Sequence, residues 1–412
     1  MAPKISQNLY RFIDTIVICL PIIIILGSPF INFTLTIGSF FFIYISIKYN
    51  FWSWTKEAWI RIAFIFWIYL NLIGINSLDL FSSFKASIFF FRFILFSLFI
   101  GYFAFNFFNY KKIFLIWFYI ILFVCLDIWV QFIFGVDLFG YEAHAWRYSG
   151  LFGNELVAGA FLWKISGPLI GLFIFEIFIK KNFKYNFVTI LFLLIPLTIL
   201  ITGERTSFIM FIFCIFISLF FFSFLLKKIK LFLISIIILT SLLFSTINLS
   251  SDVKHRYSEL LSILNNFNQS SYGVLFVSGF EVWKQNKFFG VGLKNFGKIC
   301  DRDVISTNQI HQTCSNHPHN LYIQILSETG IVGLTIFLSL FLSFFLSILK
   351  KINQINKTSI KLFIFVSTFC HLLGFLWPIV TSGSFYSSWN GFFYWIVIGI
   401  LINLTQKKSS LS

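Results

Sequence analysis

Residues 320–349 have the sequence NLYIQILSETGIVGLTIFLSLFLSFFLSIL, an apolar stretch in which Glu328 is the only charged residue. A helix adds about 1.5 Å per residue, so a helix over this stretch is longer than the roughly 30 Å of hydrocarbon in a bilayer. The stretch therefore predicts a helix that crosses a membrane.

The composition of the whole chain supports this interpretation. Of its 412 residues, 58% are hydrophobic and 11% are charged, which is more apolar surface than a water-soluble fold can bury. The predicted fold class is an all-α integral membrane protein with about twelve transmembrane helices. The twelve predicted stretches are 12–27, 30–47, 58–74, 86–105, 113–134, 156–178, 187–201, 206–226, 231–249, 320–349, 362–377 and 388–404. The first stretch has no small-residue cleavage site after it, so we expect it to be retained as a helix.

The positive charge has a pattern that argues against nucleic acid as a partner. The formal net charge is +16, but the basic residues gather at every second boundary between the predicted spans. Because such loops stay on the cytoplasmic side, both termini are predicted to be cytoplasmic. The basic clusters are Lys4 and Arg11; Lys48, Lys56 and Arg61; Lys111 and Lys112; Lys180, Lys181 and Lys184; Lys227, Lys228 and Lys230; Lys350, Lys351, Lys357 and Lys361; and Lys407 and Lys408.

The domain prediction is one polytopic membrane domain, 1–412, with one large periplasmic loop, 250–318, between spans nine and ten. Inside this loop, residues 254–265 have the spacing of an amphipathic surface helix. A second amphipathic stretch around 280–286 leads into Gly290-Val291-Gly292, where glycines let backbone come close to another group.

A polar stripe marks the start of span ten. Asn320, Gln324 and Glu328 repeat every four residues and so share one face of the helix. One interpretation is that they only hydrogen-bond neighbouring helices. The other is that they line a wet cavity and contact substrate, and His317 and His319 beside them favour this second interpretation.

Two arginines are predicted to share a face with these histidines. Arg147 precedes span six and Arg205 opens span eight, and both spans run in the same direction as span ten. Three helix N-termini, two arginines and His319 would suit a diphosphate and a hydroxyl nucleophile. Each arginine alone could instead snorkel to the interface or pair with Glu204 or Glu142.

The residues of this region resemble a known family. His319-Asn320, nine residues and then Gly330-Ile331-Val332-Gly333 is similar to the His-Asn-x9-Gly-x-x-Gly signature of the O-antigen ligase and O-antigen polymerase superfamily. Three further short motifs of this chain are similar to motifs that recur in that superfamily. They are Arg205, Arg147 with the Ser-Gly-Leu-Phe-Gly-Asn after it, and Gly290-Val291-Gly292 before Phe296.

The resemblance implies a GT-C-like glycosyltransferase of the bacterial inner membrane with its active site facing the periplasm. It implies an undecaprenyl-diphosphate-linked glycan as donor, lipid A-core or another glycan as acceptor, inversion at the anomeric carbon, and no cofactor or metal. By the same analogy, His319 is the general base and Arg147 and Arg205 hold the diphosphate, while His317, Asn320, Gln324, Glu328, Gly290 and Gly292 are the candidate substrate-binding residues.

Several other functions remain open from the sequence. Within the superfamily we favour the ligase, because the large loop falls between spans nine and ten and the His-Asn signature is intact. An O-antigen polymerase or a protein O-oligosaccharyltransferase would use the same scaffold and donor. A transporter or flippase is the alternative of another class. The sequence shows no paired halves with broken helices at midplane, which are typical of transporters.

Two cysteines and three histidines could form either a disulfide or a metal site. Cys300 and Cys314 both fall in the predicted periplasmic loop, where an oxidising compartment favours a disulfide. His311, Cys314, His317 and His319 also include metal-ligand types, but their spacing matches no standard zinc finger, and we predict no metal site.

Arg92, Asp127 and Lys164 lie at similar predicted depths, seven to nine residues from the same ends of their spans. The sequence therefore permits Asp127 to neutralise Arg92 or Lys164, or a free cation to extend the diphosphate site. We favour the neutralising pair.

Overall fold

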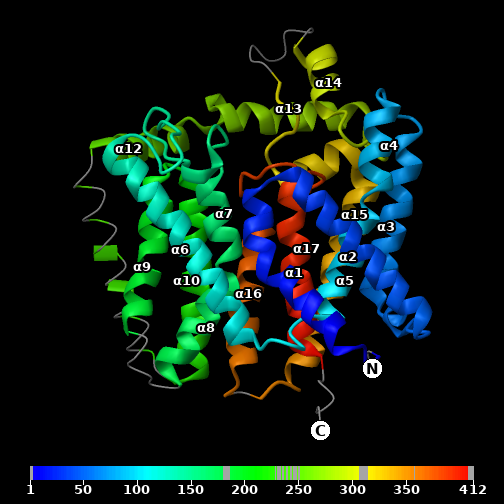
Figure 1. The fold of residues 1–412 in the computed structure, drawn as a ribbon. Coiled ribbons are helices and arrows are strands. Elements are labelled where there is room, and N and C mark those ends of the chain that lie inside the picture. The colour runs from blue at the N-terminus through cyan, green and yellow to red at the C-terminus, as the bar shows by residue number, and fades with distance from the viewer. Residues whose placement is uncertain are drawn as a thin grey trace.

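The computed structural model describes residues 3–179, 186–227, 251–305, 314–356 and 358–406, together with isolated positions between 228 and 250. In this part the chain is a bundle of helices, and isolated bridges are its only β pairing (Figure 1). The helices are α1 (Gln7–Ile25), α2 (Ser28–Lys48), α3 (Ala58–Gly74), α4 (Leu80–Ile88), α5 (Phe91–Phe103), α6 (Tyr110–Phe134), α7 (Ala158–Ile165), α8 (Gly167–Phe178), α9 (Asn186–Ile201), α10 (Arg205–Leu225), α12 (Ser251–Asn265), α13 (Ser271–Gln285), α14 (Phe296–Ile299), α15 (Leu321–Ile352), α16 (Ile360–Phe375) and α17 (Ser388–Thr405).

The helices agree with a multi-pass membrane protein. Among the described residues, 7 are long and apolar enough to cross a membrane, or up to 8 if the bent pair α7 and α8 is one span. The shorter helices α3 and α16 are also apolar. Every predicted stretch falls on a helix except 231–249, which lies largely outside the described residues.

Three predicted spans are not the simple helices that the sequence suggested. The fourth begins earlier, at Leu80, and is interrupted between α4 and α5. The sixth bends by 50° between α7 and α8, where Pro168 lacks an amide hydrogen and disfavours helical geometry in the residue before it. The tenth, α15, is kinked at Gly330.

The centre of the bundle is α17, in which every residue from Gly391 to Thr405 is buried. It packs most closely on α5, and a Cβ at Gly101 would lie only 2.7 Å from Ile402 Cγ2. Small residues at such contacts let two helices approach without a hydrophobic driving force between them.

The helices α12, α13 and α14 gather at one end of the bundle, which we call the α13 end, and α13 runs across it (Figure 1). The start of α1 and the end of α17 lie at the opposite end. The predicted amphipathic segments 254–265 and 280–286 fall on α12 and on the last part of α13.

Candidate active site at the α13 end

The start of α15 is fixed by Asn320. Its side-chain oxygen accepts hydrogen bonds from the amides of Tyr322 and Ile323 at 3.0 and 3.1 Å, which satisfies donors at the helix start. Its Nδ2 donates to the carbonyl of Pro378 at 2.7 Å. The cap therefore joins α15 to the segment between α16 and α17.

His319 lies directly before this cap in an uncommon backbone conformation. Its φ is +52°, in the left-handed region that non-glycine residues rarely adopt. The surrounding chain holds it there, since the carbonyl of His319 accepts the Ser382 amide at 2.8 Å and its Nε2 lies 3.3 Å from Ser315 Oγ. Such strain is concentrated at functional sites, and it sets the direction of the half-buried imidazole.

A second histidine and an aromatic ring accompany it. The ring centroids of His317 and His319 are 4.1 Å apart, and the Tyr272 ring of α13 stands edge-on to His319 at 5.9 Å. Burial lowers the pKa of His317 to about 3, helped by the nearby His319 and Lys294, and burial also lowers the pKa of His319 from its ordinary value of 6.5. The neutral form that accepts a proton is therefore favoured at both rings.

Arg205 opens α10 beside this histidine pair. Its Nη2 lies 3.2 Å from Glu259 of α12, an acidic partner that the sequence had not suggested. The next residue, Thr206, shares a hydrogen bond of 2.7 Å with Thr381. Since Thr381 forms a β-bridge with Asn320, the starts of α10 and α15 are connected through Thr381.

Arg147 joins the same group through Glu204. The Glu204 carboxylate caps α7 by accepting the amides of Gly159 and Ala160 at 2.6 and 3.0 Å, and it interacts electrostatically with Arg147. The Arg147 Nη2 also donates to the carbonyl of Leu156 at 3.1 Å. Arg147 is thus linked through Glu204 to the start of α10, and Thr206 and Thr381 link that start to Asn320, the residue after His319.

The rest of the polar stripe is bonded to protein groups. Gln324 donates to Ser384 at 2.7 Å and accepts the Phe385 amide at 3.0 Å, while Glu328 accepts the Lys294 amide at 3.0 Å. Both side chains are buried, with exposed fractions of 1% and 0%. Their hydrogen bonds join α15 to the segment before α17 and to the turn at Lys294, as the helix-bonding interpretation of the stripe expects.

Glycines allow the loop before α14 to approach α15. Gly290 has a φ of +72°, and a Cβ there would lie 2.4 Å from the Glu328 carbonyl carbon. The amide of Gly292 donates to the Glu328 carbonyl at 2.9 Å, and the amide of Ile331 donates to Lys287 at 2.9 Å across the kink at Gly330. These bonds use backbone groups that the break in α15 leaves without helical partners.

The two cysteines of the loop form a disulfide. Cys300 and Cys314 are bonded, with Cα atoms 6.0 Å apart. In the described part of the chain no group of three or more His, Cys, Asp or Glu side chains is arranged to hold a metal ion. His311, the remaining member of the histidine and cysteine cluster, lies outside the described residues.

The expected pairing of Asp127 with a buried cation is wrong. Asp127 instead accepts the Leu138 amide at 3.0 Å. Arg92 donates to Thr36 at 2.9 Å, and Lys164 donates to Asn390 at 2.6 Å. Equal depth in the membrane did not make these three residues neighbours.

Three residues of the site were not found by sequence reasoning. Glu204 had been considered only as an ion-pair partner, yet it caps α7. Thr381 lies in the short loop between α16 and α17, and Lys294 was hidden in the glycine-rich turn. Only the hydroxyl-rich sequence Thr381-Ser382-Gly383-Ser384 gave a local signal.

Comparison with known proteins supports the resemblance seen in the motifs. Residues 190–338 match the family model described as O-antigen ligase. The matched region begins in α9 and ends in α15, so it includes Arg205, Glu259 and His319. No curated protein matches the chain.

Proposed function

We propose, taking residues 190–338 as an O-antigen ligase domain, that the chain is a membrane glycosyltransferase that moves a glycan from undecaprenyl diphosphate to a sugar hydroxyl of lipid A-core. The reaction takes place at the α13 end, which faces the periplasm. The observation that carries the proposal is His319, a half-buried imidazole in a strained conformation, connected through Thr381 to the start of α10 and Arg205.

His319 is the general base in this reaction. The acceptor hydroxyl gives its proton to the imidazole as its oxygen attacks the anomeric carbon of the donor. The new carbon–oxygen bond forms while the bond to the diphosphate breaks, and the diphosphate leaves with the electron pair. Attack opposite the leaving group inverts the anomeric configuration.

Arg147 and Arg205 stabilise the leaving diphosphate. Guanidinium groups bind phosphate oxygens in pairs and keep their charge at any physiological pH. The N-terminus of α10 adds positive potential, whereas the start of α7 is already occupied by the Glu204 carboxylate. Two arginines and the start of α10 supply the charge that a divalent cation supplies in other glycosyltransferases, so the proposed reaction is metal-independent.

Gene deletion in the native host, followed by inspection of the lipopolysaccharide and of the lipid-linked intermediates, tests the proposal. A ligase predicts bare core together with retained lipid-linked polymer, and this is the expected result. Loss of chains longer than one repeat would identify a polymerase instead. An unchanged lipopolysaccharide would overturn both assignments.

Complementation of the deletion tests the base. His319→Ala should fail to restore capped core, whereas His144→Ala should restore it, because His144 is exposed and contributes only backbone to its bridge with Arg147. Both proteins should be present in membranes at equal amounts. Activity of His319→Ala equal to wild type would refute its role, and inhibition of the purified enzyme by EDTA would refute the metal-free step.

A further inference from the structure

A second basic site lies at the α13 end. A cavity of about 460 Å³ is formed by α2, α4, α5, Lys294 and the segment before α17. Three of its lining residues are cations, namely Lys85, Arg92 and Lys294. No carboxylate lines it among the described residues, so it is a basic cavity with hydroxyl and amide groups between the charges.

Arg92 is held in place by neutral groups. Its Nη1 and Nη2 donate to Thr36 Oγ1 at 2.9 Å and Asn32 Oδ1 at 3.2 Å, and its Nε donates to the Phe89 carbonyl at 3.2 Å. Ser388, which also lines the cavity, donates to the same Asn32 oxygen at 2.9 Å. Among the described residues the guanidinium is thus oriented by neutral groups, with no carboxylate bonded to it, and an anion could supply that charge.

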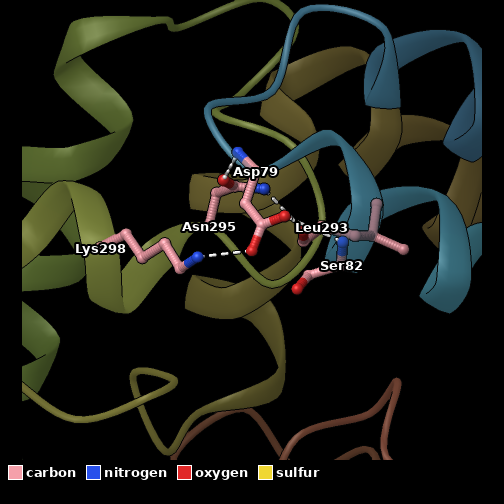
Figure 2. A network of polar contacts seen from close by, with 5 residues as sticks. All are labelled: Asp79, Ser82, Leu293, Asn295 and Lys298. Carbon is pink, nitrogen blue, oxygen red and sulfur yellow. Dashed lines mark hydrogen bonds and ion pairs between the residues drawn. The ribbon is translucent and has the colours of Figure 1, made fainter.

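Lys294 enters the cavity from a strained and braced turn. Its φ is +61°, and its amide donates to buried Glu328. Figure 2 shows the brace: the Asp79 amide donates to Asn295 at 2.7 Å, and Lys298 pairs with the Asp79 carboxylate. A conformation of this kind persists only where its surroundings enforce it, and here it directs a cation toward Lys85 and Arg92.

This cavity and Arg205 lie toward different sides of the α13 end. Arg205 contacts α12, whereas Lys85 belongs to α4, and Figure 1 shows α12 and α4 at opposite sides of the α13 end. Lys294 is close enough to His317 to act on it electrostatically. The segment of the two histidines is therefore connected to the start of α10 through Thr381 and influenced by Lys294 of the cavity.

We propose that the cavity of Lys85, Arg92 and Lys294 binds a phosphate or carboxylate group of the acceptor, opposite the donor diphosphate at Arg147 and Arg205. The assignment rests on the proposed function. A transferase with one diphosphate donor needs only one diphosphate site, so the second basic site is assigned to the acceptor. A second set of cations, in a cavity whose described lining holds no carboxylate, then selects an acceptor that carries its own anionic group. It would orient the acceptor so that its hydroxyl meets His319.

Steady-state kinetics with the two substrates varied separately test the assignment. The double variant Lys85→Ala/Lys294→Ala should raise the KM for core acceptor on the order of tenfold or more, since each lost contact to a charged group weakens binding by this scale. The KM for the lipid-linked donor should stay within about twofold, taking a tenfold change as 1.4 kcal/mol. Lys287→Ala, an exposed lysine in the same loop outside the cavity, is the matched control and should change neither.

Treatment of the core acceptor with phosphatase identifies the anionic group. The dephosphorylated acceptor should remove the difference between wild type and the double variant if phosphate is bound. If the difference persists, a carboxylate of the core is bound. A rise in donor KM alone would assign the cavity to the donor and overturn the proposal, as would unchanged KM values for both substrates.

Inorganic phosphate provides a test that does not depend on transfer activity. Phosphate should raise the melting temperature of purified wild type and of Lys287→Ala more than chloride at equal ionic strength, because a ligand that binds the native state stabilises it. The double variant should lose part of this increment, because Arg147 and Arg205 remain in place and can still bind phosphate. Equal increments in all three proteins would overturn the anion site, whereas absent transfer by wild type would count against the proposed function alone.

Discussion

Gly330→Ala is predicted to destabilise the protein more than a glycine-to-alanine change at another position that has a similar backbone conformation but open space around it. Gly330 has φ +66° and ψ −173°, a region that is essentially limited to glycine. Adopting it costs alanine about 1–3 kcal/mol. The position also interrupts α15, the helix whose start follows His319, and its neighbour Glu328 accepts the Lys294 amide.

The surroundings of Gly330 add a second cost. A Cβ there would lie 2.1 Å from the Phe288 carbonyl oxygen, so the loop must move away from α15. That movement threatens the hydrogen bonds from Ile331 to Lys287 and from Val332 to Phe288, at 2.9 and 3.3 Å. Each bond contributes about 0.5–1.5 kcal/mol. The expected total is roughly 2–6 kcal/mol.

Gly27→Ala is the matched control. Gly27 precedes α2 with φ +90° and ψ −168°, and a Cβ there would meet nothing within 4 Å. It isolates the conformational strain of about 1–3 kcal/mol from the collision.

Melting temperatures in one detergent, together with transfer rates in reconstituted membranes, provide the comparison. Gly330→Ala should lower both more than Gly27→Ala does. Equal losses in the two variants would show that the approach of the loop to α15 contributes nothing, and the reasoning would be refuted.

Three further predictions concern the site and its loop. Burial lowers the pKa of His319 from its ordinary value of 6.5, so the neutral form persists to lower pH. The acidic limb of the pH profile of kcat/KM should therefore have its midpoint below pH 6.5. A midpoint above that value would contradict the assignment. The Cys300–Cys314 bond closes a loop of separation 14, so replacing both cysteines by serine should destabilise the protein by about 3 kcal/mol, and mass spectrometry without reduction should find the linked peptides; free thiols at both positions would disprove the bond. Glu259→Gln removes the carboxylate that pairs with Arg205, an interaction worth no more than about 1 kcal/mol. Arg205 would then bind the diphosphate without this competitor, so the donor KM should fall by up to about fivefold. A rise in donor KM would show that Glu259 helps to bind the donor.

The sequence alone determined the features that depend on local order. The apolar stretches predicted the described helices, because a segment of sufficient length with few charges has no other place to hide its surface. The cap at Asn320 and the stripe through Gln324 and Glu328 followed from helical spacing. The glycines of the His-Asn-x9-Gly-x-x-Gly signature marked the position of the kink, although its conformation was not visible.

Only the tertiary structure decided which of these features meet. Position along a span gives the depth of a residue but not the rotation of its helix, so the equal depths of Arg92, Asp127 and Lys164 did not pair them. The partner of Arg205 came from α12, and the basic cavity combined α4, α5 and the turn at Lys294. These groups are far apart in the chain, and their contacts depend on how each helix is turned and packed against its neighbours, which no local pattern records.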